Sequence, residues 1–115
     1  MKLSGEGKLL RIFFGEADRH NGQQLFEAIV HLARSKGLAG ATVLRGIEGF
    51  GARSRIHKTT ILELSEDLPI VIEIVDTAEK IEALIPEVDA MIEGAHCGAM
   101  MTMEKVDVRK YSAGK

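Results

Sequence analysis

The chain has 115 residues, 45% hydrophobic and 28% charged, so it is too apolar for a disordered protein and suits one globular domain over residues 1–115. Its single cysteine excludes an intrachain disulfide, and no stretch approaches the about 18 apolar residues of a membrane span, so we expect a cytoplasmic protein. The net charge of −2 argues against a general nucleic-acid binder.

The first predicted elements are a strand and a helix. The apolar run Leu9–Gly15 predicts a buried strand. Asn21 stands three residues before Gln24, in capping-box spacing, and predicts a helix start. Apolar residues then recur at helical intervals: Leu25, Phe26, Ile29, Val30, Leu32 and Ala33. Gly37 predicts the helix end, because glycine readily adopts the left-handed conformation common after a helix.

The middle of the chain predicts three strands and one long loop. Runs rich in β-branched residues predict strands at Ala41–Ile47, Thr59–Leu64 and Ile70–Val75. The loop Gly46–Lys58 contains three glycines, which allow sharp turns: Gly46, Gly49 and Gly51.

The second predicted helix carries a proline. Asp76 and Glu79 repeat the capping-box spacing, and apolar residues recur at helical intervals: Ile81, Leu84, Ile85, Val88, Met91 and Ile92. Pro86 removes one backbone hydrogen bond inside this helix, so we expect a kink or a restart near Ile85.

The last predicted strand changes its apolar phase. Met101 and Met103 alternate in one phase, and Val106 and Val108 alternate in the other. An extra residue in the strand would produce this shift, so we expect a β-bulge near Glu104 and Lys105.

The order of elements predicts the fold class. Two βαβ units around a pair of antiparallel strands predict an α+β protein, a ferredoxin-like βαββαβ sandwich with an extra β-hairpin. Two helices cover only one face of such a sheet, so we expect other copies of the chain to bury the second face.

The long loop is the basic part of an acidic chain. Between residues 45 and 58 four cations (Arg45, Arg53, Arg55 and Lys58) and one acid (Glu48) give +3, which leaves −5 for the rest. The stretch is either a solvated basic loop or a site for a compact anionic ligand. Its glycines follow neither the P-loop nor the GxGxxG order.

Metal-binding and catalytic groups are sparse. The soft ligands are His20, His31, His57, His96 and Cys97, of which only His96 and Cys97 are adjacent. This spacing is poor for a metal site, so we predict no metal ligand. We interpret two acid pairs as helix-entry and turn-forming residues, respectively Glu16 with Asp18 and Glu66 with Asp67. No general acid/base pair is therefore apparent, and we predict no catalytic residue and no enzyme.

Several segments together carry a family resemblance. Thr42-Val43, Gly49-Phe50-Gly51 and Leu68-Pro69 stand in the order found in PII signalling proteins, ahead of Ile72–Val75. The segments LRGIxGFG, SRIH, LSEDLP and VIEIVD resemble an uncharacterised PII-like family still more closely. The resemblance implies a homotrimer that binds adenine nucleotides in clefts between subunits and presents a mobile loop to a partner protein. The candidate partners include membrane proteins.

The resemblance assigns residues by position. The implied nucleotide-binding residues are Thr42, Gly49, Phe50, Gly51, Arg53, Gly94, His96, Gly98 and Arg109. The implied partner-binding residues of the loop are Arg53, Arg55, His57 and Lys58. The chain departs from PII proteins by its shorter loop and by the absence of a phosphate-binding lysine near Ala99-Met100. We therefore expect ADP or AMP as an effector, and no permanent cofactor.

Two alternatives come from other functional classes. A CutA-like trimeric protein that binds divalent metals or acts in stress shares this fold and would need clustered His and Cys ligands. A small ferredoxin-like enzyme acting on an acidic metabolite would use Arg53, Arg55 and His57, and would need His57 buried in a closed pocket.

Overall fold

The computed structural model describes residues 4–51, 57–58 and 67–114. The elements in chain order are β1 (Gly5–Gly15), β2 (Arg19–His20), β3 (Gln23–Gln24), α1 (Leu25–Ser35), β4 (Thr42–Arg45), β5 (Glu48–Gly49), β6 (His57–Lys58), β7 (Pro69–Asp76), α2 (Ala78–Ala95) and β8 (Met100–Val108). The strand predicted at Thr59–Leu64 lies outside the described residues.

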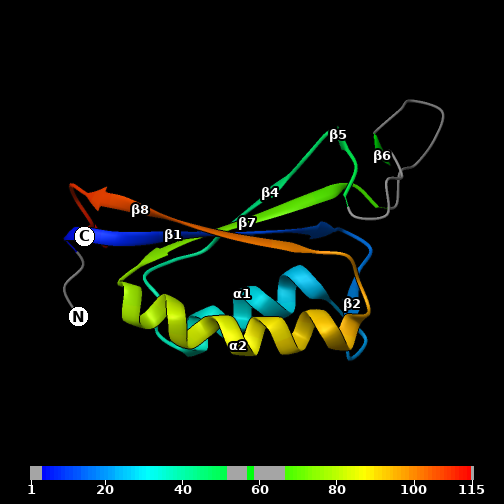
Figure 1. The fold of residues 1–115 in the computed structure, drawn as a ribbon, viewed down its shortest axis with the longest axis horizontal. Helices are drawn as coiled ribbons and strands as arrows, with labels where there is room; N and C mark the ends of the chain where they lie inside the picture. Colours follow the sequence, from blue (N-terminus) through cyan, green and yellow to red (C-terminus); the bar gives the residue numbers. More distant parts are fainter. Residues whose placement is uncertain (1–3, 52–56, 59–66, 115) are drawn as a thin grey trace.

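The main sheet is antiparallel, in the order β4-β7-β1-β8. Helices α1 and α2 lie side by side on one face of it, as Figure 1 shows. Helix α1 lies between β1 and β4 in the chain and α2 between β7 and β8, and in each case one other strand separates the two strands in the sheet, which is the ferredoxin-like arrangement. The predicted fold class is confirmed. Strands β5 and β6 pair with each other as a separate hairpin at one end of the molecule.

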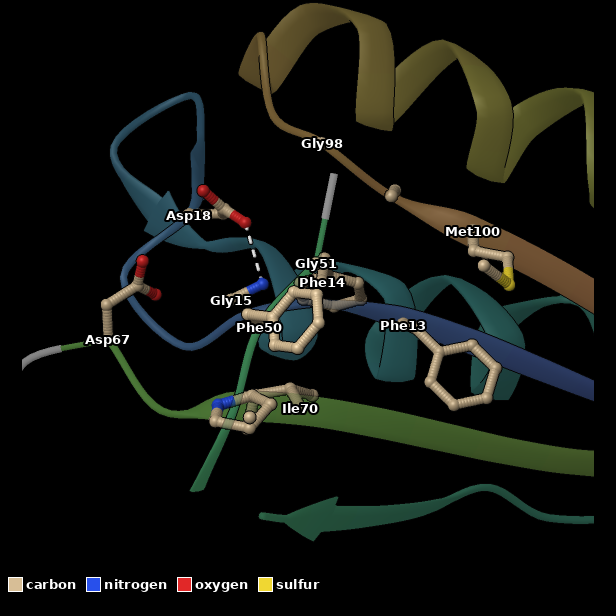
Figure 2. Close-up of a pocket in the computed structure, with 13 residues that line it drawn as sticks. Phe13, Phe14, Gly15, Asp18, Phe50, Gly51, Asp67, Ile70, Gly98 and Met100 are labelled. Carbon is tan, nitrogen blue, oxygen red and sulfur yellow. Dashed lines mark hydrogen bonds between the residues drawn. The ribbon is translucent and has the colours of Figure 1, made fainter. Parts of the chain in front are cut away.

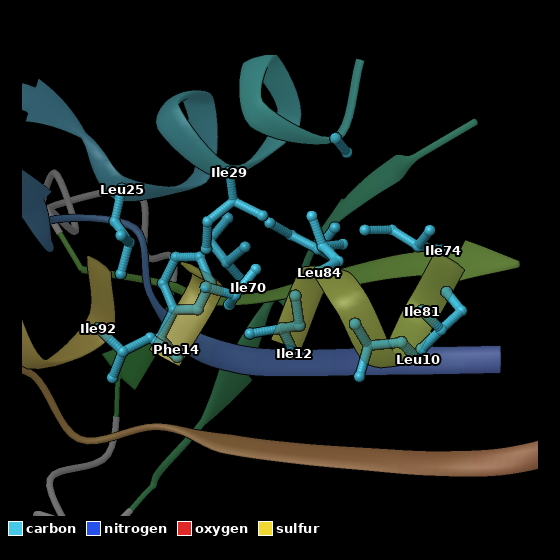
Figure 3. Packing of buried hydrophobic residues seen from close by; sticks show 13 residues of the cluster. Leu10, Ile12, Phe14, Leu25, Ile29, Ile70, Ile74, Ile81, Leu84 and Ile92 are labelled. Atoms are coloured by element: carbon cyan, nitrogen blue, oxygen red, sulfur yellow. The ribbon is translucent and has the colours of Figure 1, made fainter. Parts of the chain in front are cut away.

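The core lies between the helices and the sheet (Figure 3). Even-numbered residues of β1 and β7 point toward the helices, because side chains of a strand alternate between its faces. The buried members are Leu10, Ile12 and Phe14 from β1, Ile70, Ile72 and Ile74 from β7, Leu25, Ile29 and Ala33 from α1, and Ile81, Leu84, Val88 and Ile92 from α2. The odd-numbered residues of β1 and β7, with the even-numbered residues of β4 and β8 that pair with them, form the opposite face of the sheet, here called the outer face.

Helix α1 begins later than the capping-box spacing predicts. Asn21 and Gly22 have positive φ values of 51° and 79° and form the two-residue turn between β2 and β3. Asn-Gly is the pair best suited to such a turn, so the turn chemistry prevails over capping. Gln24 is the residue before the helix and makes no side-chain cap. The predicted end is confirmed, with Gly37 at a φ of 77° just beyond Lys36.

Helix α2 also has a different cap from the one predicted. Thr77, not Asp76, is the N-cap, and its hydroxyl accepts the backbone N–H of Lys80 at 3.3 Å. Pro86 does not split the helix, which runs as one element through Ala95. Pro86 and Glu82 are both exposed, so the carbonyl of Glu82, which loses its partner four residues on, faces water.

Strand β8 has no bulge. Its register with β1 is continuous from Gly5 opposite Val108 to Phe13 opposite Met100. The apolar residues of β8 change phase because the two methionines and the two valines lie on opposite faces of the sheet. Met101 packs against the core on the helix side, whereas Val106 and Val108 belong to the outer face. The predicted bulge near Glu104 and Lys105 is therefore wrong.

Candidate functional site

A cavity of about 610 Å³ opens at the end of the sheet where β1 and β7 meet the hairpin and the start of β8 (Figure 2). The lining residues are Phe13, Phe14, Gly15, Asp18, Gly49, Phe50, Gly51, Asp67, Pro69, Ile70, Gly98, Ala99 and Met100. Most of this wall is aromatic, aliphatic or glycine, which suits a flat organic group with a few polar contacts.

Backbone hydrogen bonds hold the segments around the cavity together. The N–H of Glu16 donates to the carbonyl of Leu68 at 2.8 Å, and the N–H of Gly46 donates to that of Pro69 at 2.7 Å. A Cβ atom on Gly46 would lie 2.9 Å from Cγ of Pro69, so the loop can leave β4 at this close distance only with glycine there. The start of β7 thus positions both the end of β1 and the base of the loop.

Two carboxylates, those of Asp18 and Asp67, stand near Gly15 at one end of the cavity (Figure 2). Asp18 Oδ2 accepts the N–H of Gly15 at 2.8 Å, and Asp67 Oδ1 accepts the N–H of Ala17 at 2.9 Å. A Cβ atom on Gly15 would collide with the carboxylate of Asp67, so a larger residue there would have to displace that side chain. The bond from Ala17 agrees with the turn-forming interpretation of Asp67. The first acid pair was interpreted as helix-entry residues, but Asp18 closes the turn after β1 instead, and α1 begins only at Leu25. Both carboxylates lie at the cavity.

Arg45, the last residue of β4, is paired before the chain enters the hairpin. The guanidinium of Arg45 donates to the carboxylate of Glu16, whose side chain is only 16% exposed. Arg45 does not line the cavity. Among the described lining residues, the only charged side chains are Asp18 and Asp67.

The structure brings together two of the segments that the PII-like pattern assigns to nucleotide binding. Gly49, Phe50 and Gly51 from the hairpin base and Gly98 from the loop after α2 line the same cavity. Phe50 is 68% exposed and extends across the cavity in Figure 2.

Four other predicted nucleotide-binding residues lie elsewhere in the protomer. Thr42 is exposed on the outer face of β4, opposite Glu73. Gly94 lies in the last turn of α2 against His20, and His96 is the exposed left-handed residue that ends this helix.

Arg109 follows β8 at the opposite end of the sheet from the cavity, because Met100 pairs with Phe13 and Val108 pairs with Gly5. Nine residues of strand span roughly 30 Å, so Arg109 does not reach the cavity of its own chain.

The predicted partner-binding loop is only partly described. Arg53 and Arg55 lie outside the described residues. His57 and Lys58 form β6, whose backbone pairs with Glu48 and Gly49 of β5. His57 pairs with Gly49, which lines the cavity, so the hairpin places β6 next to one of the lining segments.

Sequence reasoning missed the rest of the cavity wall. Phe13 and Met100 are opposite each other across β1 and β8, on the outer face, and they line the end of the cavity away from the carboxylates. The pairing of Phe13 with Met100 could have placed both residues together, but it can be derived from the sequence only if β8 is known to have no bulge.

The described residues show neither a metal-binding cluster nor a membrane-spanning helix. Across residues 4–51, 57–58 and 67–114, no group of three or more His, Cys, Asp or Glu side chains is placed to hold a metal ion. In the same ranges, no helix combines the length and hydropathy that a bilayer crossing requires.

Comparison with known sequences identifies related proteins. The family model DUF190, described as "Uncharacterized ACR, COG1993", matches residues 7–108. A UPF0166 protein of Aquifex aeolicus is 40% identical over 101 residues, which cover 88% of this chain and 91% of the relative. A UPF0166 protein of Methanocaldococcus jannaschii is 34% identical over 88 residues, with coverages of 76% and 81%.

Solved structures share the fold at low sequence identity. CPII, a nitrogen regulatory PII-like protein from Thiomonas intermedia bound to ADP, AMP and bicarbonate, has a TM-score of 0.69 at 17% identity, covering 91% of this chain and 90% of CPII. A putative PII-like signaling protein from Thermus thermophilus has a TM-score of 0.65 at 19% identity, with coverages of 95% and 94%. The divalent ion tolerance protein CutA1 from Ehrlichia chaffeensis scores 0.52 at 11% identity, with coverages of 97% and 89%.

Proposed function

Since the chain belongs to the DUF190 family of uncharacterised proteins and has the fold of PII-like proteins, we propose that it is a regulatory protein that binds an adenine nucleotide. The nucleotide binds at the cavity, and the loop over residues 46–58 then docks on a partner protein. Binding and docking require no catalysis.

The cavity carries this proposal. It joins Gly49-Phe50-Gly51 to Gly98, the two segments whose counterparts build the nucleotide cleft in PII proteins. Glycines let a ligand approach the backbone closely, and Phe50 offers an aromatic face for a base. CPII, whose chain superimposes on nine tenths of this one, was solved with ADP and AMP. The hairpin β5–β6 begins at the cavity wall, so an occupant would contact the loop that meets the partner.

The same proposal includes a homotrimer, because the outer face of the sheet lacks a cover within the described chain. Apolar side chains lie on all four strands of this face: Leu9 and Phe13, Leu44, Val71 and Val75, and Met100. Leu44 and Met100 are 48% and 61% exposed. Burial of such a face between copies is the simplest way to remove it from water.

The charged residues of the outer face form ion pairs with one another within one protomer. Arg11 Nε donates to Oε2 of Glu73 at 2.9 Å, and its Nη1 donates to Glu104. These hydrogen bonds, that to Glu73 first, raise the pKa of Arg11. A charge that has its partner on the same sheet is less costly to cover than an unpaired one.

The nucleotide site is tested by Phe50→Ala. We expect the variant to bind ADP about tenfold more weakly than the wild type, because stacking of a base on an aromatic side chain contributes about 1 to 3 kcal/mol. Isothermal titration calorimetry with ADP measures the change. Ile47→Ala is the matched control, since Ile47 is 82% exposed in the same loop and does not line the cavity. Equal ADP affinity in wild type and Phe50→Ala would show that the base does not bind against Phe50 in this cavity.

The trimer is tested by Val71→Asp. Val71 lies opposite Phe13 and Leu44 on the outer face, so we expect an aspartate there to dissociate the assembly. Light scattering coupled to size exclusion should give three times the 12.5 kDa chain mass for the wild type and a single chain for the variant. Ala90→Asp, at an exposed position of α2, should stay trimeric. A monomeric wild type at micromolar concentration would contradict the assembly.

The CutA-like alternative has less support. Its fold similarity is lower, and the described residues offer no three-ligand cluster for a divalent metal. A thermal-shift screen with divalent metals beside adenine nucleotides separates the two functions, because a ligand that binds only the folded protein raises its midpoint.

A further inference from the structure

The side chains of the outer face are arranged in rows that run across the four strands of the sheet. One row is entirely apolar and consists of Leu44, Val71, Phe13 and Met100. The next row is entirely polar and consists of Thr42, Glu73, Arg11 and Thr102. In the third row Val75 lies opposite Leu9 on the two central strands, and Glu104 of β8 lies beside Leu9. A polar band therefore crosses a face that is otherwise mostly apolar.

Arg11 joins the charged members of this band, here called the Arg11 cluster. Its Nε donates to Oε2 of Glu73 at 2.9 Å, and its Nη1 donates to Oε1 of Glu104. Among the described residues of the four strands, these three are the only charged side chains on the outer face. The side chains of Arg11 and Glu73 are 37% and 34% exposed, so a molecule that covers this face meets the cluster directly.

We infer that the Arg11 cluster is the specificity determinant of the self-association surface, in that it selects one arrangement of the neighbouring copies and thereby their number. Apolar contacts are non-directional, so rows of similar apolar side chains can pack in several shifted positions at nearly equal free energy. Charged groups penalise every position that covers them with apolar side chains, because they lose water without gaining a partner. A single polar position in an apolar seam fixes the register of coiled coils in the same way.

The selected arrangement also bears on the cavity. Phe13 and Met100 belong both to the apolar row of the outer face and to the cavity wall, so the position of a neighbouring copy determines what lies over that end of the cavity. The inference rests on the proposed homotrimer and identifies the residues that restrict the assembly to one form.

Replacing the whole cluster by apolar side chains, as Arg11→Met with Glu73→Leu and Glu104→Leu, is the sharpest test. This triple variant keeps and enlarges the apolar surface, so we expect it to associate at least as tightly as the wild type but in more than one form. Light scattering coupled to size exclusion should give one species of three chain masses for the wild type and a mixture of several multiples of 12.5 kDa for the variant.

Thr102→Leu is the matched control. It adds apolar surface opposite Arg11 in the same band and keeps all three charges, so it should remain a uniform trimer. Far-UV circular dichroism checks that the control and the triple variant are folded. A mixture in the control would show that added apolar surface alone causes heterogeneity, and would overturn the selecting role. A triple variant that stays a uniform trimer, or that falls apart into monomers, would overturn it as well.

A second variant tests whether the cluster lies inside the contact between copies. Arg11→Met alone leaves two carboxylates without their cation, so the concentration at which half of the chains are assembled should rise at least about tenfold. The dissociated chains should stay folded, because Arg11 lies outside the core. Assembly of Arg11→Met at the wild-type concentration would overturn the inference, whereas a wild type that is monomeric would overturn the proposed trimer itself.

Discussion

Replacing Ile72 with alanine should lower the free energy of unfolding by about 4 kcal/mol, the typical cost of a large-to-small change in a packed core. Ile72 is fully buried at the centre of the sheet, with Ile12 and Val43 opposite it on the neighbouring strands. Because all three side chains come from strands held in register, the sheet cannot collapse to fill the cavity that the change leaves.

Chemical denaturation of both proteins at one protein concentration measures this loss, since an assembly's stability depends on concentration. Ile47→Ala removes the same atoms from a side chain that is 82% exposed and should change stability by less than about 0.5 kcal/mol. A loss for Ile72→Ala no larger than that of Ile47→Ala would mean that the core is not packed as described.

Replacing Asp76 with alanine should cost about 3 kcal/mol, because the change leaves buried backbone donors without an acceptor. Asp76 is the one fully buried charged residue among those described. Its Oδ2 accepts the N–H of Ala39 at 2.8 Å and its Oδ1 accepts the N–H of Thr77 at 2.6 Å. The carboxylate thus ties the connection after α1 to the start of α2.

Asp76→Asn retains one oxygen acceptor, so its free energy of unfolding should fall less than that of Asp76→Ala. Asp89→Ala, on the exposed side of α2, should leave the free energy of unfolding almost unchanged. Hydrogen exchange of the Ala39 and Thr77 amides gives a local readout, and both should exchange faster in Asp76→Ala. Unchanged protection of both amides would show that other groups hold this corner of the fold.

Much of the fold could be predicted from local patterns. An apolar run placed β1, a run rich in β-branched residues placed β7, and helical spacing placed α1 and α2, because burial requires apolar residues at these positions. Gly37 marked a helix end correctly, since its φ of 77° disfavours other residues. The errors arose where two local rules competed, as at Asn21, where a turn prevailed over a helix cap.

The candidate site was predictable only as separate pieces. The segment Gly49-Phe50-Gly51 and the loop containing Gly98 were recognised from motif order, but their meeting in one cavity depends on the sheet. Gly46 at the base of the hairpin bonds to Pro69 of β7, and Met100, just after the second loop, pairs with Phe13 of β1. Asp67 was interpreted correctly as a turn former, whereas Asp18, expected at a helix entry, closes the turn after β1. Their position at the cavity wall depends on the contact between Ala17 and Asp67, which are 50 residues apart in the chain.

The sequence by itself determined which residues are core, which form strands and helices, and which loop is basic, because each follows from spacing along the chain. Only the tertiary structure decided which faces the residues of β8 occupy, that Asp76 is a buried acceptor and not a cap, and that the cavity's described charges are negative. These features arise from pairs such as Phe13 with Met100 and Ala39 with Asp76, which are far apart in sequence and adjacent only when the sheet has formed. Local propensity carries no record of such contacts, since their energy appears only when the chain closes the intervening loops.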